Sequence, residues 1–586
     1  MNIKYTDSFE VLKKKLESLG GEWSEDGLKK KVLRVDGGVM NWFETTGTLS
    51  FQGKEPGLSK LKQNVPNLLY PTEFKKPSLV KENTELYKAP PPKKEKSVEQ
   101  LYLTGKFSET EIVIGIVNAV GTEYRRVLEP LKDRLKGFGY HAEEIRISTL
   151  LATPSVDDLS EYDRIKHYMN EGNACRKNAN SNAILAAGAI DKIKTARVPK
   201  RKTAYIINSL KHPDEIDFLR RVYGVGFYLF GIHADERRRL EYLMKDKSLT
   251  QTEAVELIHV DEDEKIEYGQ KTRDTFHLSD FFISLGKNDD QVKSTLERFL
   301  ELLFSNPFRN PTFDEFAMFM AFNASIRSSD LSRQVGAVIS RTEQIIATGA
   351  NDTPKSGGGQ YWATVNSDTG EVTDAPAGKD YTLERDSNKS AQQEIVSEIA
   401  NSLIKEKFVD EVQREDIQKI LMRSTISDLT EFGRVVHAEM EAILSCSRVG
   451  ISTMGASLYC TTFPCHNCAK HIIDAGIKRV VYVEPYPKSR ALELHSDAIT
   501  LKTSFDSHDE ERRVTFEPFT GVGARRFLDL FSINLGGGAK LKRKDKNGDT
   551  VEWARSNAVA RTPMLPKSYL DLEMSASEVW IESKEG

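Results

Sequence analysis

The spacing of hydrophobic residues predicts an α/β protein with a small α+β module at one end. In residues 1–56, an amphipathic helix, SFEVLKKKLESLG, precedes alternating strand-like runs that flank a Gly-Gly turn. From residue 111 onwards, buried strand-like runs such as EIVIGIV alternate with amphipathic helical stretches such as RRVLEPLKDRLKG. After Pro311, a helix, FDEFAMFMAFNAS, precedes two strands, QVGAVIS and QIIATGAND.

Shifts in composition divide the chain further. Residues 57–108 are rich in Lys, Pro and Glu and include YKAPPPKKEKS, which predicts an extended linker. Two α/β domains follow, at 109–305 and 306–535. A C-terminal extension at 536–586 carries a hairpin signal, KRKDKNGDTVEWA, with an Asn-Gly turn. The second domain contains an insertion at about 352–430 that begins as a Gly/Ser/Asp-rich loop and becomes helical, and we expect it to form a lid or a subunit contact.

Two interpretations of the N-terminal module stay open. A packing or oligomerisation module is favoured, because short Lys runs such as those of this module are usually solvated faces. A nucleotide-sensing or nucleic-acid-binding role is the alternative, since Lys13–Lys15 and Lys29–Lys31 form basic runs.

One constellation carries chemistry: HAEMEAIL at residue 437 and TTFPCHNCAKHIIDAGI further along the chain. His437, Cys465 and Cys468 supply three zinc ligands, and a catalytic zinc needs three protein ligands and one open position for water. Both stretches are typical of helix starts, so two helix N-termini should converge on the metal. Glu439 is the carboxylate that would take a proton from the water and return it to the substrate.

A structural zinc site is the alternative, and it would need a fourth ligand. His466 lies between the two Cys and should point away from the metal, while Cys460 ends an apolar run and is expected in the core. Because Glu439 also stands in the catalytic place, the catalytic interpretation is favoured. The candidates for a fourth ligand are His466, His471, Cys446 and Cys460.

Composition excludes some classes of function. With 586 residues, 39% hydrophobic and 29% charged, the chain is long enough for several globular domains. Its net charge of −4 shows no overall bias toward nucleic acid or membrane. No apolar run is long enough to span a membrane, and the first residues lack a signal-peptide core. Five scattered or metal-assigned Cys fit a reducing cytoplasm, where we expect the protein.

The first α/β domain opens with a strand, a Gly-bounded turn and a helix, the order of a phosphate-binding loop. Gly115, Gly121 and Thr122 are the candidate loop residues, but their spacing departs from the motif and no Lys precedes Thr122. Residues 110–305 resemble the P-loop nucleoside and nucleotide kinases. The resemblance leaves open a degenerate kinase-like domain that binds a nucleotide or only scaffolds, an active phosphotransferase, or an unrelated α/β domain. Arg237–Arg239 could hold phosphates or form an exposed helix face.

The second α/β domain resembles the deoxycytidylate deaminases. The HxE…PCxxC motif is the signature of zinc-dependent nucleobase deaminases. The resemblance implies an α/β/α cytidine-deaminase fold and a sugar-binding role for Asn351, which ends a strand. Ser332 and Arg333 fall where substrate or phosphate contacts could form, and a solvated turn is the alternative. The later turn EPYPKS adds candidates for base or phosphate contact: Tyr486, Lys488 and Ser489.

The whole arrangement resembles the bacterial anti-phage cytidine deaminases, in which a P-loop kinase-like three-layer domain precedes the deaminase domain. This resemblance implies that the substrates are free deoxycytidine nucleotides, dCTP and dCMP, and that their depletion blocks phage DNA synthesis. It also implies a homo-oligomer, a dTTP or ATP effector, and an inhibitory regulator, either RNA or protein. A housekeeping dCMP deaminase of dTMP supply and a nucleotide-sensing module are the alternatives. The chain lacks a dense basic stretch with interleaved aromatics, which disfavours a polynucleotide substrate.

Overall fold

The computed structural model of the protein places its described residues in two compact units, Met1–Lys94 and Glu95–Gly586. No helix of this described part is long and apolar enough to cross a membrane. The structure describes residues 3–5, 7–26, 29–69, 103, 110–151, 159–198, 201–262, 264, 268–286, 288–429, 431–484, 489–502 and 513–564.

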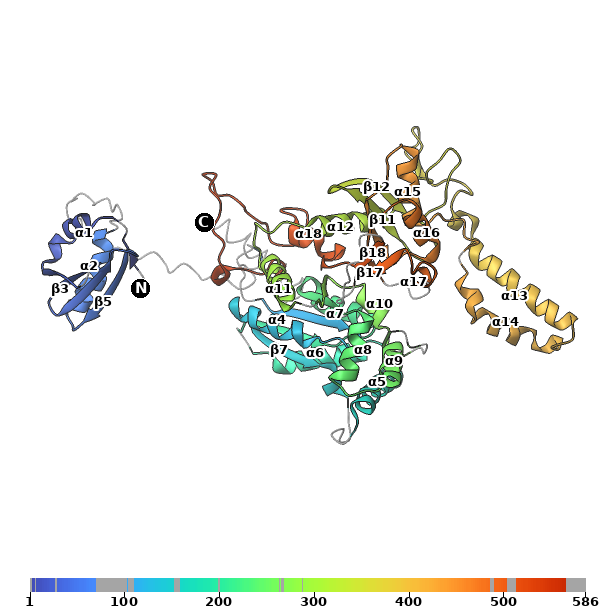
Figure 1. Ribbon diagram of the computed structural model, residues 1–586, viewed down its shortest axis with the longest axis horizontal. Coiled ribbons are helices and arrows are strands. Elements are labelled where there is room, and N and C mark those ends of the chain that lie inside the picture. The colour runs from blue at the N-terminus through green and yellow to red at the C-terminus, as the bar shows by residue number, and fades with distance from the viewer. Residues whose placement is uncertain are drawn as a thin grey trace, which may run out of the picture. The chain divides into compact units, whose positions relative to one another are not determined.

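The N-terminal unit is a five-stranded antiparallel sheet with helices packed on it (Figure 1). Helix α2 lies in the stretch that composition assigned to the linker, so the linker does not begin at residue 57. Its Lys and Pro residues hid apolar positions that recur every four residues, and Leu61, Val65 and Leu69 are all buried in the core of the unit. The elements are β1 (Ile3–Lys4), α1 (Phe9–Lys15), β2 (Glu22–Glu25), β3 (Lys30–Val35), β4 (Gly38–Phe43), β5 (Thr48–Gly53) and α2 (Gly57–Leu69).

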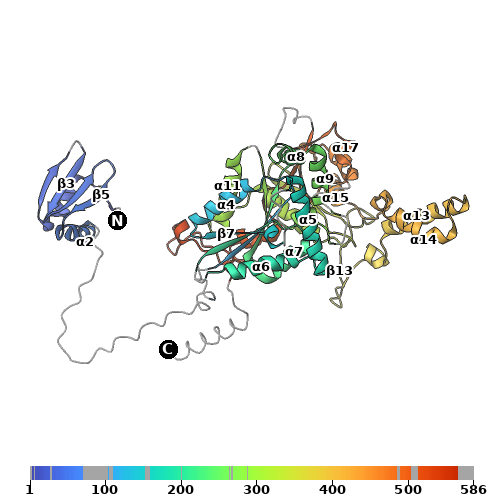
Figure 2. The same ribbon diagram turned by 90° about the horizontal axis from the view of Figure 1, so that it is seen from below.

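The first α/β domain is built on a mainly parallel sheet in the order β19-β10-β9-β6-β8-β7, with helices on both faces (Figure 2). Strand β6 shows how both faces become cores. Ile114 and Ile116 pack with α4 and α11, whereas Val113 and Val117 pack with α6 and α7. The elements are β6 (Ile112–Asn118), α4 (Arg125–Gly137), β7 (His141–Arg146), α5 (Glu161–Asn178), α6 (Ile184–Ala196), β8 (Thr203–Asn208), α7 (Pro213–Tyr223), β9 (Phe227–His233), α8 (Glu236–Lys245), α9 (Gln251–Glu262), α10 (Thr272–Phe276), β10 (Phe281–Ser284) and α11 (Asp289–Leu303).

The second domain also has a covered six-stranded sheet, in the order β12-β11-β15-β16-β18-β17. Two glycines set its helices close: a Cβ on Gly336 would lie 1.9 Å from the carbonyl oxygen of Ala321 in α12, and one on Gly349 would lie 2.1 Å from that of Ala438 in α15. The α/β class expected from the sequence is thereby confirmed. The elements are α12 (Phe313–Ser325), β11 (Gly336–Arg341), β12 (Gln344–Ala350), α15 (Ala438–Arg448), β15 (Ser457–Thr462), α16 (His466–Asp474), β16 (Arg479–Glu484), α17 (Ala491–Leu494), β17 (Ile499–Leu501), β18 (Val514–Pro518), β19 (Gly521–Val522) and α18 (Ala524–Phe531).

The insertion between β12 and α15 is partly helical, as its sequence indicates. Its first part contains a two-stranded hairpin, β13 (Thr364–Val365) and β14 (Val372–Thr373). Helices α13 (Ser387–Lys405) and α14 (Arg414–Met422) then lie side by side and extend away from the sheet (Figures 1 and 2).

The two domains share structure across their junction. Strand β19, which follows the second domain's sheet in sequence, pairs antiparallel with β10 of the first sheet. The C-terminal stretch then packs back on the first domain, where Arg561 N–H donates to the Leu303 carbonyl and Met564 N–H donates to the Thr110 hydroxyl. Its Asn-Gly turn is present, but a single bridge, Lys544 to Thr550, stands in place of two strands.

Candidate metal centre

The end of strand β12 positions the first metal ligand. Asp352 and Val436 form an isolated antiparallel bridge, in which each N–H donates to the other carbonyl at 3.3 and 3.0 Å. His437 follows directly and is the N-cap of α15, and Glu439 is in the first turn of that helix. The bridge therefore brings the strand end and the zinc helix together across the whole insertion.

A second helix start supplies the two thiols. Cys465 is the N-cap of α16, and its sulfur accepts the N–H of Cys468 at 3.4 Å. The Nδ1 atom of His437 lies 3.4 Å from the Cys465 sulfur and 3.3 Å from the Cys468 sulfur. With Zn–N bonds of about 2.0 Å and Zn–S bonds of about 2.3 Å at tetrahedral angles, such donors lie about 3.5 Å apart, so the three residues fit zinc.

The group has three members, as a catalytic zinc requires. Within the described residues, no fourth His, Cys, Asp or Glu joins it. His466 lies 3.6 Å from the Glu431 carboxylate, and the Nδ1 atom of His471 lies 2.7 Å from the Asn467 carbonyl. Cys446 and Cys460 are buried in the core between the sheet and α15.

The surroundings of the site shift the pKa values of its groups in opposite directions: that of Cys465 falls, whereas those of Cys468 and Glu439 rise. A hydrogen bond from Cys468, aided by His437, lowers the pKa of Cys465 to about 4. The same hydrogen bond, together with burial, raises the pKa of Cys468. Burial raises the pKa of Glu439, whose side chain is only 4% exposed, and the nearby Cys465 thiolate raises it further. A carboxyl with a raised pKa is suited to accepting and returning a proton.

A cavity of about 420 Å³, here called the zinc-site cavity, opens onto these residues. Its volume falls within the range of small-molecule sites. His437, Glu439 and Cys465 line one part of it, and Phe463 lines another. The arrangement can hold a small ring against a metal-activated water and a buried proton acceptor.

Three of the predicted substrate residues line this cavity. Asn351 is 6% exposed, and its side chain is held by Val335 N–H at 2.7 Å and by its own donation to the Arg333 carbonyl at 2.9 Å. Ser332 and Arg333 both line the cavity, and the Arg333 guanidinium lies 3.3 Å from the Glu484 carboxylate. The structure thus brings all three to the zinc site, and their contact with substrate stays a prediction.

The later turn contributes differently. Ser489 does not line the zinc-site cavity; its hydroxyl donates to the Pro464 carbonyl at 2.8 Å and so ties the chain after β16 to the turn that carries Cys465. Tyr486 and Lys488 lie outside the described residues.

The proposed phosphate loop is only partly where the sequence placed it. Gly115 lies inside β6, where a Cβ would come 2.6 Å from Leu210, so packing within the sheet explains this glycine and it does not belong to the loop. Gly121 and Thr122 do lie between β6 and α4. Of the Arg cluster, Arg238 pairs with Glu123 and Arg239 pairs with Glu262 at 2.8 Å, so these two hold the domain together.

Sequence reasoning missed the contribution of the insertion to the zinc-site cavity. Asp380, Asp386 and Asn388 all line it, and Asp380 pairs with Arg434 at 3.0 Å. Asp380 lies in a short 3-10 turn before α13, and Asn388 lies in the first turn of α13, so no periodic pattern marks either as facing inward. A sequence signal exists only for Asp386, which is the N-cap of α13.

Comparison with known proteins places the zinc site in a family context. Residues 311–484 match a family model described as the cytidine and deoxycytidylate deaminase zinc-binding region. The deoxycytidylate deaminase of Enterobacteria phage T2 is 33% identical over 171 residues, which are 29% of this chain and 79% of the phage protein. That of Schizosaccharomyces pombe is 25% identical over 306 residues, 52% of this chain and 76% of the yeast protein. ComE operon protein 2 of Bacillus subtilis is 57% identical over 53 residues, but these are only 28% of that protein and 9% of this chain.

Two solved structures are each similar to about a third of this chain. The dCMP deaminase of cyanophage S-TIM5, solved in complex with dCMP and dUMP, is 20% identical with a TM-score of 0.20 and covers 36% of this chain and 98% of its own. A gluconokinase from Sinorhizobium meliloti 1021 is 15% identical with a TM-score of 0.20 and covers 33% of this chain and 96% of its own.

Proposed function

Since this chain belongs to the deoxycytidylate deaminase family, we propose that it hydrolyses free deoxycytidine nucleotides, dCTP, dCMP or both, to the uracil nucleotide and ammonia. The observation that carries the proposal is the buried Glu439 beside the His437, Cys465 and Cys468 ligand set, at the wall of a cavity of nucleotide size.

Different residues of the site have different roles in the proposed reaction. His437, Cys465 and Cys468 would hold the zinc, which when bound would lower the pKa of a coordinated water. Glu439 accepts one proton from that water and gives it to the ring nitrogen next to the amino-bearing carbon; it then accepts the second proton, from the hydroxyl added to that carbon, and gives it to the departing amino group as the carbonyl forms. One water is consumed and one ammonia is released, so the carboxylate ends the cycle as it began. Phe463 lines the cavity near Cys465 and gives part of its wall an apolar aromatic surface.

Charge around the zinc-site cavity supports a free nucleotide over a nucleic-acid strand. Among the described lining residues, Arg333 is the single basic side chain, whereas Asp330, Asp380 and Asp386 are acidic. A strand of many phosphates would meet repulsion from these carboxylates, because polynucleotide sites are basic grooves with aromatic stacking platforms. A nucleotide with one phosphate group near Arg333 would not.

The biological role that we propose is depletion of the deoxycytidine nucleotide pool during phage infection. It rests on the order of an N-terminal kinase-like domain and a C-terminal deaminase domain. The same site would also serve a housekeeping dCMP deaminase with an appended regulatory domain. Assembly as a homo-oligomer, a dTTP or ATP effector and an RNA or protein inhibitor are parts of the same proposal.

Ammonia release by the zinc-loaded full chain tests the proposed reaction. We expect turnover of dCTP or dCMP and none of single-stranded DNA; activity on the strand alone would overturn the substrate assignment. Nucleotide pools in phage-infected cells then separate the two roles. A drop in dCTP that requires Glu439 and follows infection supports defence, whereas a constant dCMP-to-dUMP flux without infection supports the housekeeping role.

A further inference from the structure

A second cavity, of about 500 Å³, lies in the first α/β domain, and we call it the sheet-edge cavity. The chain that follows β6, β7 and β8 lines it, so it sits at the carboxyl ends of neighbouring parallel strands. Ligands of open α/β sheets bind at this edge. The cavity shares no lining residue with the zinc-site cavity.

The sheet-edge cavity is strongly basic. Seven Arg or Lys side chains line it against three acidic ones, Glu123, Glu161 and Asp261. Five of the seven cations are paired, for example Arg176 with Glu215 at 3.0 Å and Arg164 with Glu161 at 2.7 Å. The other two, Arg125 and Arg146, have no carboxylate within ion-pair distance in the described part of the chain, so the cavity keeps uncompensated positive charge.

Buried polar atoms point to a missing hydrogen-bonding partner. Thr122, Asn118 and Asn208 line the cavity and are 4%, 7% and 6% exposed. The Thr122 hydroxyl and the amide oxygens of Asn118 and Asn208 have no partner among the described residues. Buried groups of this kind are normally paired, because each costs free energy when left alone. A bound polar molecule would satisfy them.

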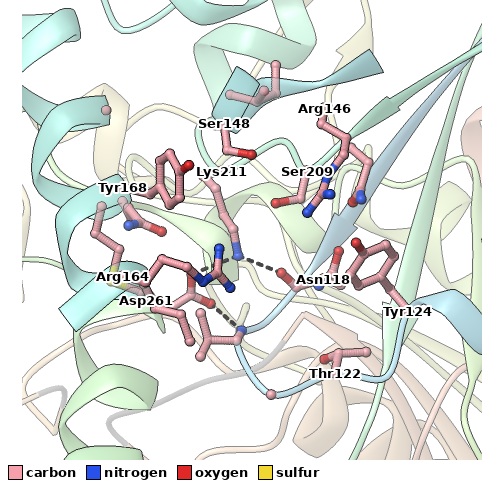
Figure 3. Close-up of a pocket in the computed structure, with 18 of the residues that line it drawn as sticks. Asn118, Thr122, Tyr124, Arg146, Ser148, Arg164, Tyr168, Ser209, Lys211 and Asp261 are labelled. Atoms are coloured by element: carbon pink, nitrogen blue, oxygen red, sulfur yellow. Dashed lines mark hydrogen bonds and ion pairs between the residues drawn. The ribbon is translucent and has the colours of Figure 1, made fainter. Parts of the chain in front are cut away.

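An aromatic and apolar wall stands opposite part of this polar surface. Figure 3 shows Tyr168 of α5 on the other side of the cavity from Arg146 and Tyr124. Met169 and Leu185 line the cavity as well. A cavity with cations at one side and an aromatic ring at the other fits an anion that carries a flat ring.

Lys211, one of two lysines that line the sheet-edge cavity, is not placed for phosphoryl transfer. Lys211 donates to the Asp261 carboxylate and to the Asn118 carbonyl, both at 2.7 Å (Figure 3). Asp261 is fully buried and also accepts the N–H of Val120 in the loop after β6. The Asp261 carboxylate therefore already accepts hydrogen bonds from the Val120 amide and the Lys211 ammonium, which a phosphate in transfer would need as donors. This arrangement favours binding without catalysis.

We propose that the sheet-edge cavity binds a nucleoside phosphate, with the phosphate at Arg125, Arg146 and the Thr122 hydroxyl and the base against Tyr168. This ligand is distinct from the substrate of the zinc site, and the inference does not depend on deamination.

Calorimetric titration of the full-length, zinc-loaded protein tests the proposal. The probes are ATP, GTP, dTTP, AMP, adenosine and inorganic phosphate. We expect at least one of the nucleotides to bind, and adenosine and inorganic phosphate each to bind at least about tenfold more weakly, since charge-assisted hydrogen bonds and base stacking must both contribute. Equal affinity for inorganic phosphate, or no nucleotide binding below about 1 mM, would overturn it.

Matched variants locate the binding. R146E should weaken nucleotide binding at least about tenfold, whereas R333E at the zinc-site cavity should leave it unchanged. The opposite pattern would assign the nucleotide to the zinc site and overturn the proposal. T122V removes the partnerless hydroxyl, so it should weaken binding without lowering the unfolding temperature. Weaker binding together with a lower unfolding temperature would instead mean that Thr122 is structural.

Discussion

At the scale of single residues, Glu439 is expected to transfer protons without binding the metal. Its carboxyl is buried beside the ligands but is not among the atoms that could hold the ion. E439Q should therefore lower kcat for dCMP by about 10²–10⁴-fold, the usual contribution of a positioned acid–base group. Zinc should stay bound. Deamination kinetics measure the fall in kcat, and zinc analysis of the same preparation measures the metal content.

The control for this prediction is C468S, which removes a ligand and should lose zinc together with activity. Loss of zinc from E439Q as well would contradict the assigned role, because a proton carrier does not hold the metal.

Arg333 supplies a second prediction at this scale. As the only described basic residue at the zinc-site cavity, it should contact substrate phosphate and not the base. R333A should raise KM for dCMP by on the order of tenfold, since a charge-assisted hydrogen bond is lost. KM for deoxycytidine, which has no phosphate, should stay unchanged. An equal rise for both substrates would show that Arg333 only supports the fold around Glu484.

The functional role of a residue could be predicted where the residues that act together lie in short motifs of the sequence. His437, Glu439, Cys465 and Cys468 follow from two short motifs, because ligand spacing on helix starts is fixed by backbone geometry. Asp380, in contrast, reaches the zinc-site cavity through the packing of a long insertion, which no short pattern encodes.

At the scale of elements, helix α12 depends on one buried carboxylate at its start. Glu315 is 1% exposed, caps α12 by accepting the Thr312 N–H, accepts the Val522 N–H of β19, and pairs with Arg298 of α11. E315Q keeps the size of the side chain but turns an acceptor into a donor against these N–H groups. We expect about 3 kcal/mol of lost stability, measured by urea unfolding.

The matched control is E129Q, because Glu129 is 56% exposed and lies 3.5 Å from Lys132. It should change stability by no more than about 0.5 kcal/mol. Equal effects of the two substitutions would contradict the role given to Glu315.

Elements with clear periodicity were predictable, whereas those masked by composition were not. Val113 and Ile114 alternate between two cores, so β6 was evident as a buried strand. Helix α2 was missed because its exposed residues are polar, including Lys60 and Lys62, and because it contains Pro66, so its buried apolar positions were masked by composition. Gly115 looked like a loop residue since sequence alone does not reveal that Leu210 and Phe227 press on it.

At the scale of the whole molecule, the second unit is held together by contacts between segments far apart in sequence. Arg526 of α18 donates to the Phe227 carbonyl, and its guanidinium stacks on the Tyr228 ring at 4.8 Å. Periodicity and motif spacing describe neighbours along the chain, so they placed two domains but not the joint between them.

This joint predicts that both α/β domains of the second unit unfold together. Hydrogen exchange across a urea series should show peptides from β6 and β15 losing protection at the same denaturant concentration, because β19 and the C-terminal stretch link the two sheets. R526L should move the two midpoints apart, since it removes the Arg526 contacts with Phe227 and Tyr228 across the joint while Arg220 still neutralises Asp280 at 3.1 Å. R525L, at the exposed neighbouring position, should leave them coincident. Two separate midpoints in the unsubstituted protein would mean that the domains fold independently and that the joint contributes little to stability.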